Sequence, residues 1–81
     1  MIDTDLRELD QLIDQVSGPV DSQCELLREH LESARAYLLG KMAEEYVFSL
    51  WLADEAVNCV VNTDQRRHTS EVIHHLIEAS D

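Results

Sequence analysis

The sequence contains little glycine, proline, lysine or aromatic residue, and each shortage narrows the possible folds. Its 81 residues include two glycines, one proline and a single lysine, Lys41, while aromatic residues make up 5%. So few turn-forming residues disfavour a turn-rich β fold and favour helices. The sequence also has no glycine-rich phosphate-binding loop, no Cys-x-x-Cys pair and no Gly-x-Ser-x-Gly turn around a nucleophile.

Long hydrophobic runs are also absent. Uncharged runs reach eight residues, as from Tyr46 to Ala53, whereas a membrane-spanning helix needs about 20. The first residues, Met-Ile-Asp-Thr-Asp, are acidic, whereas a secretory signal begins with basic residues followed by an apolar run. We therefore expect a soluble cytoplasmic protein with no membrane partner.

Positive charge is scarce. Seventeen acidic residues stand against six basic ones, which gives a formal net charge of −11. Such a charge repels phosphate backbones, so direct binding to nucleic acid is not expected. Three explanations of the acidity fit the sequence: ordinary solubility, adaptation to a salt-rich cytoplasm, or a dedicated negative binding face.

What the sequence does have is apolar residues at helical spacing. They make up stripes with intervals of three and four residues, which is the pattern of amphipathic helices. The intervals predict helices at about 4–16, 22–39, 44–62 and 69–79. The stripes are Ile2, Leu6, Leu9, Ile13 and Val16; Cys24, Leu27, Leu31, Ala34 and Leu38; Tyr46, Leu50, Ala53, Val57 and Val60; and Val72, Ile73, Leu76 and Ile77. The expected fold is all-α, an antiparallel bundle of three main helices and a short C-terminal helix in one domain, residues 1–81.

Several boundaries follow from local signals. Ser17-Gly18-Pro19 ends the first helix, and Ser22 with Glu25 predicts a capping box for the second. Gly40 either ends the second helix or lies inside one helix of about 40 residues; the change in apolar phase after Leu38 favours a break. Residues 62–65, Asn-Thr-Asp-Gln, predict a turn before the last helix.

The third predicted helix is apolar around more than half of its circumference. A chain of this length buries only about 63% of its surface, so an isolated monomer would be marginally stable. We therefore expect a homodimer that covers part of this helix. The surface predicted to form the interface consists of Tyr46, Val47, Leu50 and Trp51, because aromatic and large apolar residues commonly anchor protein interfaces.

The last predicted helix carries the weak candidates for a metal site. Glu71 and His74 have the i,i+3 spacing of helix-bundle di-metal sites, and His75 lies four residues from Glu71. Such a site needs a second Glu-x-x-His and further facing glutamates, which the sequence does not supply unless a two-fold axis doubles the motif. The expectation is no metal and no cofactor.

The two cysteines, Cys24 and Cys59, lie 35 residues apart on or beside apolar stripes. The pattern favours buried free thiols that pack as small apolar groups. A disulfide between the two middle helices is possible, but a reducing compartment would not require one.

These observations predict a small acidic helical module that binds another protein, as an adaptor, inhibitor or regulatory subunit, and that is not an enzyme. One alternative is an acidic nucleic-acid mimic that blocks the groove of a DNA- or RNA-binding protein. A metal-binding helical bundle is the third hypothesis.

Overall fold

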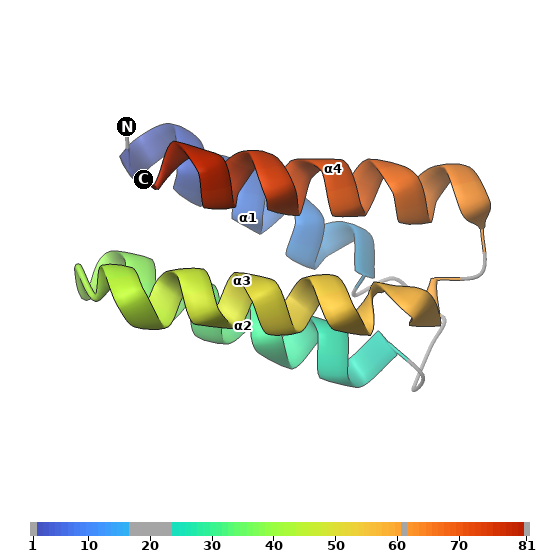
Figure 1. The fold of residues 1–81 in the computed structure, drawn as a ribbon, viewed down its shortest axis with the longest axis horizontal. Coiled ribbons are helices and arrows are strands. Elements are labelled where there is room, and N and C mark those ends of the chain that lie inside the picture. Colours follow the sequence, from blue (N-terminus) through green and yellow to red (C-terminus); the bar gives the residue numbers. More distant parts are fainter. Residues whose placement is uncertain (1, 17–23, 61, 81) are drawn as a thin grey trace.

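Four antiparallel helices follow one another in a bundle in the computed structural model, which describes residues 2–16, 24–60 and 62–80. The helices are α1 (Ile2–Val16), α2 (Glu25–Leu39), α3 (Ala43–Ala56) and α4 (Thr63–Ala79), with a short 3-10 helix, η2 (Val57–Cys59), directly after α3. Helix α2 lies between α1 and α3, and α4 lies against α3 and, less extensively, α1. The start of α1 and the end of α4 lie at the same end of the bundle as the α2–α3 turn (Figure 1).

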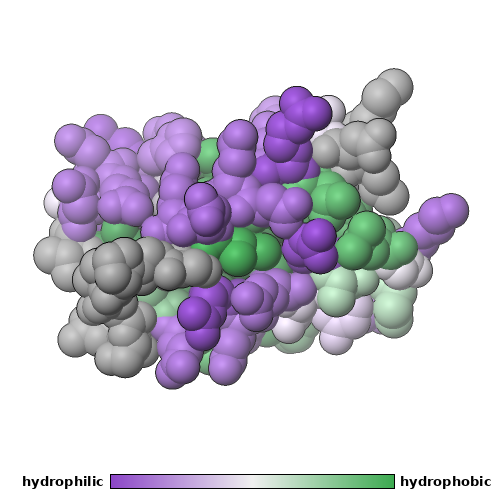
Figure 2. All heavy atoms as spheres, turned by 180° about the vertical axis from the view of Figure 1, so that it is seen from behind, coloured by the Kyte–Doolittle hydropathy of each residue, from purple (hydrophilic) through white to green (hydrophobic). Residues whose placement is uncertain are grey.

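Most of the core consists of residues from the predicted apolar stripes. Helices α2, α3 and α4 contribute three buried apolar residues each; those of α3 are Tyr46, Leu50 and Ala53, and Val57 follows in η2. The other buried apolar residues are Leu9, Leu12, Cys24, Leu27, Leu31, Ala34, Val60, Ile73, Leu76 and Ile77. On the face formed by α1 and α2, hydrophilic side chains cover the outside and apolar ones show along the seam (Figure 2). The predicted all-α fold is therefore confirmed, whereas the bounds of the third and fourth helices differ from the prediction.

The break at Gly40 is confirmed, with a detail that the sequence does not reveal. Met42 N–H donates to the Tyr37 carbonyl (2.9 Å), and Lys41 N–H donates to the Leu38 carbonyl (3.2 Å). These are the two hydrogen bonds of a Schellman motif, which needs a residue of positive φ. That residue is Lys41, at φ 59°, whereas Gly40 has φ −82°.

The prediction of a short C-terminal helix from residue 69 is wrong. Helix α4 begins at Thr63 and has 17 residues, more than any of α1, α2 and α3. The side chain of Asn62 accepts a hydrogen bond from the Gln65 N–H at 3.0 Å, so a sequence taken for a turn forms a helix cap. Asn and Asp favour both roles, which is why composition alone does not separate them.

The third helix is shorter than predicted. It ends at Ala56 instead of about residue 62, and the chain passes through η2 to an extended Val60. The second helix begins at Glu25, and the side chain of its N-cap residue, Cys24, makes no capping hydrogen bond. The predicted cap at Ser22 and the break at Ser17-Gly18-Pro19 lie outside the described residues.

The structure also contradicts the prediction of free thiols. Cys24 and Cys59 form a disulfide, with their Cα atoms 5.3 Å apart. The bond joins the start of α2 to η2, at the bundle end opposite the α2–α3 turn (Figure 1).

Candidate functional site

The predicted interface residues divide between the core and the surface. Tyr46 and Leu50 are 2% and 0% exposed and lie in the core of the single chain. Val47 is half-buried, whereas Trp51 is 48% exposed. Only part of the predicted set therefore remains available to a partner, and the buried pair belongs to the fold.

Phe48 is an exposed aromatic residue beside Trp51 that the predicted interface did not include. It is 63% exposed, and it lies three residues before Trp51 on α3. Residues 44, 48, 51 and 55 share one outward stripe, on which Glu44 and Glu55 are also exposed. The two glutamates were the available sequence signal, because charged residues four positions before Phe48 and after Trp51 mark a face toward water. We call Phe48 and Trp51, with Glu44 and Glu55, the α3 stripe.

A hollow of about 450 Å³ adjoins the α3 stripe. Its lining consists of Ala43, Glu44, Val47, Phe48, Trp51 and Ser80. Most of these residues come from α3, and Ser80 follows the end of α4. The hollow is therefore shallow and mainly apolar, with the Glu44 carboxylate in its lining.

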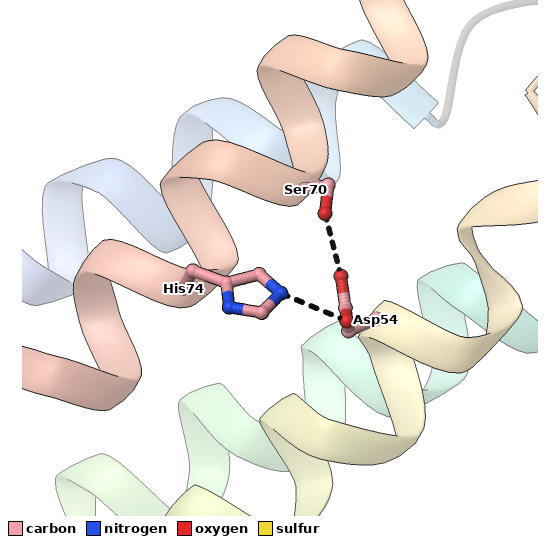
Figure 3. A network of polar contacts seen from close by, with 3 residues as sticks. All are labelled: Asp54, Ser70 and His74. Atoms are coloured by element: carbon pink, nitrogen blue, oxygen red, sulfur yellow. Dashed lines mark hydrogen bonds and ion pairs between the residues drawn. The ribbon is translucent and has the colours of Figure 1, made fainter.

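Behind Trp51, three polar residues tie α3 to α4. Ser70 Oγ donates to Asp54 Oδ1 at 2.8 Å, and His74 Nε2 lies 3.0 Å from Asp54 Oδ2 (Figure 3). The His74 ring also meets the indole of Trp51 edge to face, with ring centroids 5.9 Å apart. Asp54 thus contacts both Ser70 and His74 of α4, and the His74 ring packs against one side of the Trp51 indole.

The same three residue types form the catalytic triad of many hydrolases, but their order here differs. In a triad the histidine hydrogen-bonds the serine and takes its proton, while the carboxylate orients the histidine. Here Ser70 donates to Asp54 instead (Figure 3). This arrangement orients side chains and joins helices, and it leaves the serine hydroxyl without a histidine base.

The weak metal candidates lie along α4 without converging. Glu71, His74 and His75 are all exposed, and the recorded polar contact of His74 is with Asp54. Within residues 2–16, 24–60 and 62–80, no group of three His, Cys, Asp or Glu side chains is arranged to hold a metal ion. The spacing of Glu71 and His74 is thus present without the facing ligands that a metal site requires.

Basic residues mark the other end of the α3–α4 face. Arg66 and Arg67, from the first turns of α4, line a hollow of about 410 Å³ together with Asp54, Ser70 and Glu71. The guanidinium of Arg66 donates to the Val60 carbonyl at 3.4 Å. The face therefore changes from apolar near Phe48 to mixed charge near Arg66.

A separate polar feature lies in the core. The Tyr46 hydroxyl and Glu8 Oε2 are buried, and neither makes a hydrogen bond of full geometry among the described residues, although the Ser80 hydroxyl lies near enough to Tyr46 to act on its pKa. Burial raises the pKa of Tyr46 from 10.0 to about 12; the charge of Asp5 and, less strongly, that of Glu8 add to the rise, while the Ser80 hydroxyl opposes it. The phenol is consequently neutral at physiological pH.

This raised pKa predicts a loss of stability in alkali. The unfolded chain releases the Tyr46 proton near pH 10, whereas the folded chain holds it until about pH 12. The stabilisation is fully present below pH 10 and falls by about 2 kcal/mol as the pH rises to 12. Urea unfolding at a series of pH values should show this loss in the wild type and in Tyr37→Phe, but not in Tyr46→Phe. An equal loss in Tyr46→Phe would contradict the prediction.

The chain matches no protein-family model, no curated protein and no solved structure. None of the helices in the described ranges is long and apolar enough to cross a membrane. The functional argument therefore rests on the surfaces and side-chain contacts above.

Proposed function

We propose that this chain is a small helical interaction module that binds another protein through the α3 stripe. The observation that carries the proposal is the exposure of Phe48 and Trp51, 63% and 48%, side by side on one helix. Large aromatic residues dominate the energetics of protein interfaces when a partner buries them. The edge-to-face contact with His74 holds the indole in place, which lowers the entropy lost on binding.

The charges around the stripe specify the partner's chemistry. Glu44 and Glu55 bracket the two aromatic residues, and the chain as a whole carries a net charge of −11. A partner segment with apolar residues flanked by lysine or arginine would complement both features. The stripe covers about 16 Å of helix at 1.5 Å per residue, which suits a partner helix of about three turns.

The same charges bear on the homodimer predicted from the sequence. A two-fold dimer places the same patch of each copy against the other, so the glutamates of the α3 stripe would meet glutamates. Repulsion between two chains of net charge −11 adds to this cost. We therefore favour a different protein as the partner, and the emission of Trp51 across a dilution series tests the dimer directly.

The disulfide bears on the cytoplasmic location that the sequence predicts. Disulfides persist in oxidising compartments and are rare in the cytosol, so the Cys24–Cys59 bond argues for a less reducing environment. Alkylation of free thiols during lysis, followed by intact mass, decides whether the bond exists in cells.

The test of the interaction proposal compares two sets of variants in a tagged pull-down eluted with a salt gradient. The double variant Phe48→Ala/Trp51→Ala should bind a captured protein at least tenfold more weakly than the wild type, since hot-spot truncations cost above 1.4 kcal/mol. Leu26→Ala, which removes a 55% exposed side chain from α2, should bind as the wild type does. Matching urea midpoints would show that all variants are folded.

Two results would overturn the proposal. One is undiminished capture by the double variant. The other is a basic nucleic-acid-binding partner that leaves in moderate salt and competes with DNA, which would favour the acidic-mimic hypothesis, because surface ion pairs are screened by salt whereas an apolar contact is not.

A further inference from the structure

A second hollow, distinct from the α3 stripe, is lined by residues of the α2–α3 turn and by Ser80, which follows α4. The turn and the end of α4 lie at the same end of the bundle (Figure 1). The hollow has a volume of about 280 Å³, near the lower limit for sites that take small molecules. Residues from all four helices or their ends line it, among them Asp5, Tyr37, Leu38, Met42, Tyr46 and Ser80. The lining combines apolar side chains with a carboxylate and hydroxyl groups.

The Tyr46 hydroxyl is the unusual group in this hollow. Tyr46 is 2% exposed, and its oxygen makes no hydrogen bond of full geometry among the described residues, although the Ser80 hydroxyl lies near enough to lower its pKa. The neighbouring hydroxyl of Ser80 donates to the Leu76 carbonyl at 3.0 Å. Buried polar groups are nearly always paired, and an unpaired one in a native fold calls for an explanation. A ligand that supplies the missing hydrogen bond is one such explanation.

The surroundings determine what that ligand would be. The carboxylates of Asp5 and Glu8 both act on Tyr46 electrostatically, and both raise its pKa. Glu8 does not line the hollow, and its Oε2 is buried without a hydrogen-bond partner among the described residues. Carboxylate and hydroxyl oxygens near one another, in a chain of net charge −11, attract a group that carries positive charge and several hydrogen-bond donors.

We propose that the hollow between Asp5, Tyr46 and Ser80 binds a primary ammonium group on a short apolar stem. The ammonium donates to the Asp5 carboxylate and to the hydroxyl oxygens of Tyr46 and Ser80. The stem packs against Leu38 and Met42. Either a free amine or the side chain of a lysine on a partner has this chemistry, and the experiment below separates the two.

Lys41 offers a test of the sign of the ligand's charge. It also lines the hollow, and it is exposed beside the turn. Its ammonium repels a cationic ligand and attracts an anionic one. Lys41→Met should therefore strengthen the binding of an amine about twofold, whereas it would weaken the binding of a carboxylate.

The experiment uses the full disulfide-bonded chain and follows backbone amide NMR shifts on titration with benzylamine, benzyl alcohol and benzoate. Benzylamine should shift the amides of the turn and of Ser80, with at least tenfold weaker binding for the alcohol and for benzoate. Tyr46→Phe and Asp5→Asn should each lower the affinity for benzylamine about tenfold, which is the effect expected for loss of a hydrogen bond to a charged group. Phe48→Ala, a change in the adjoining hollow, should leave the affinity for benzylamine unchanged.

Titration with N-acetyl-lysine amide separates the two sources. Shifts at the same amides would assign the hollow to a partner's lysine, and their absence beside a benzylamine response would assign it to free amines. Equal binding of benzylamine and benzyl alcohol, or full benzylamine binding by a folded Tyr46→Phe, would overturn the proposal. If neither benzylamine nor N-acetyl-lysine amide shifts the amides, the proposal is also overturned. Water would then be the hydrogen-bond partner of the Tyr46 hydroxyl.

Discussion

Reduction of the Cys24–Cys59 disulfide is expected to lower the free energy of unfolding by about 4 kcal/mol. The bond closes a loop over a sequence separation of 35 residues, and the loss of loop entropy in the unfolded chain gives this magnitude. A domain of this size has a total stability of about 5–10 kcal/mol. Removal of one bond therefore brings the protein close to its unfolding threshold at physiological temperature.

Urea unfolding with and without a thiol reductant measures the effect, with mass spectrometry to establish that the bond is open. The double variant Cys24→Ala/Cys59→Ala should unfold near the midpoint of the reduced wild type and should not respond to reductant. If the wild type keeps its midpoint after full reduction, the disulfide does not stabilise the fold as argued.

The cysteines show where inference from the sequence ends. Their positions on apolar stripes correctly indicate burial for Cys24, which is 6% exposed, whereas Cys59 is only partly buried. Whether they pair depends on how α2 and α3 align, because antiparallel packing brings the start of one helix to the end of the other. Apolar spacing determines which face of a helix is buried, but it does not determine the helix's axial position against its neighbour.

The local signals differ in how well they predict the fold. Apolar periodicity locates four helices and most of the core, because burial of one face dominates helix stability in proteins. The polar run from Asn62 to Gln65 is ambiguous, since its side chains can stabilise either a turn or a helix start. The left-handed residue is Lys41 and not the adjacent Gly40, which follows from the geometry of the turn and not from intrinsic preference.

Position on the helix predicts only part of the candidate interface. Trp51 lies about 100° from the main apolar stripe, so its exposure can be anticipated from the sequence. Tyr46 and Leu50 fall on that stripe, and the single chain buries both. The Asp54–Ser70–His74 contact joins residues 16 and 20 positions apart, and no spacing rule within one helix can anticipate a contact between two.

Substitution of Leu50 by alanine is expected to destabilise the chain by about 3 kcal/mol, whereas Phe48→Ala should change its stability by less than about 0.5 kcal/mol. Leu50 is 0% exposed and Phe48 is 63% exposed. Truncation of a buried leucine leaves a cavity and forfeits its transfer free energy, while truncation of an exposed side chain loses few contacts. The two residues lie two positions apart on α3, so helix propensity affects both comparably.

Urea unfolding of both variants at concentrations that span a hundredfold range measures these changes and tests the oligomer at once. For a monomer with the α3 stripe open, Leu50→Ala is the destabilised variant and neither midpoint depends on concentration. If Phe48→Ala also loses several kcal/mol and the wild-type midpoint rises with concentration, the α3 stripe is buried between copies of the chain. That result would restore the homodimer predicted from the sequence, and it would remove the surface on which the proposed partner binds.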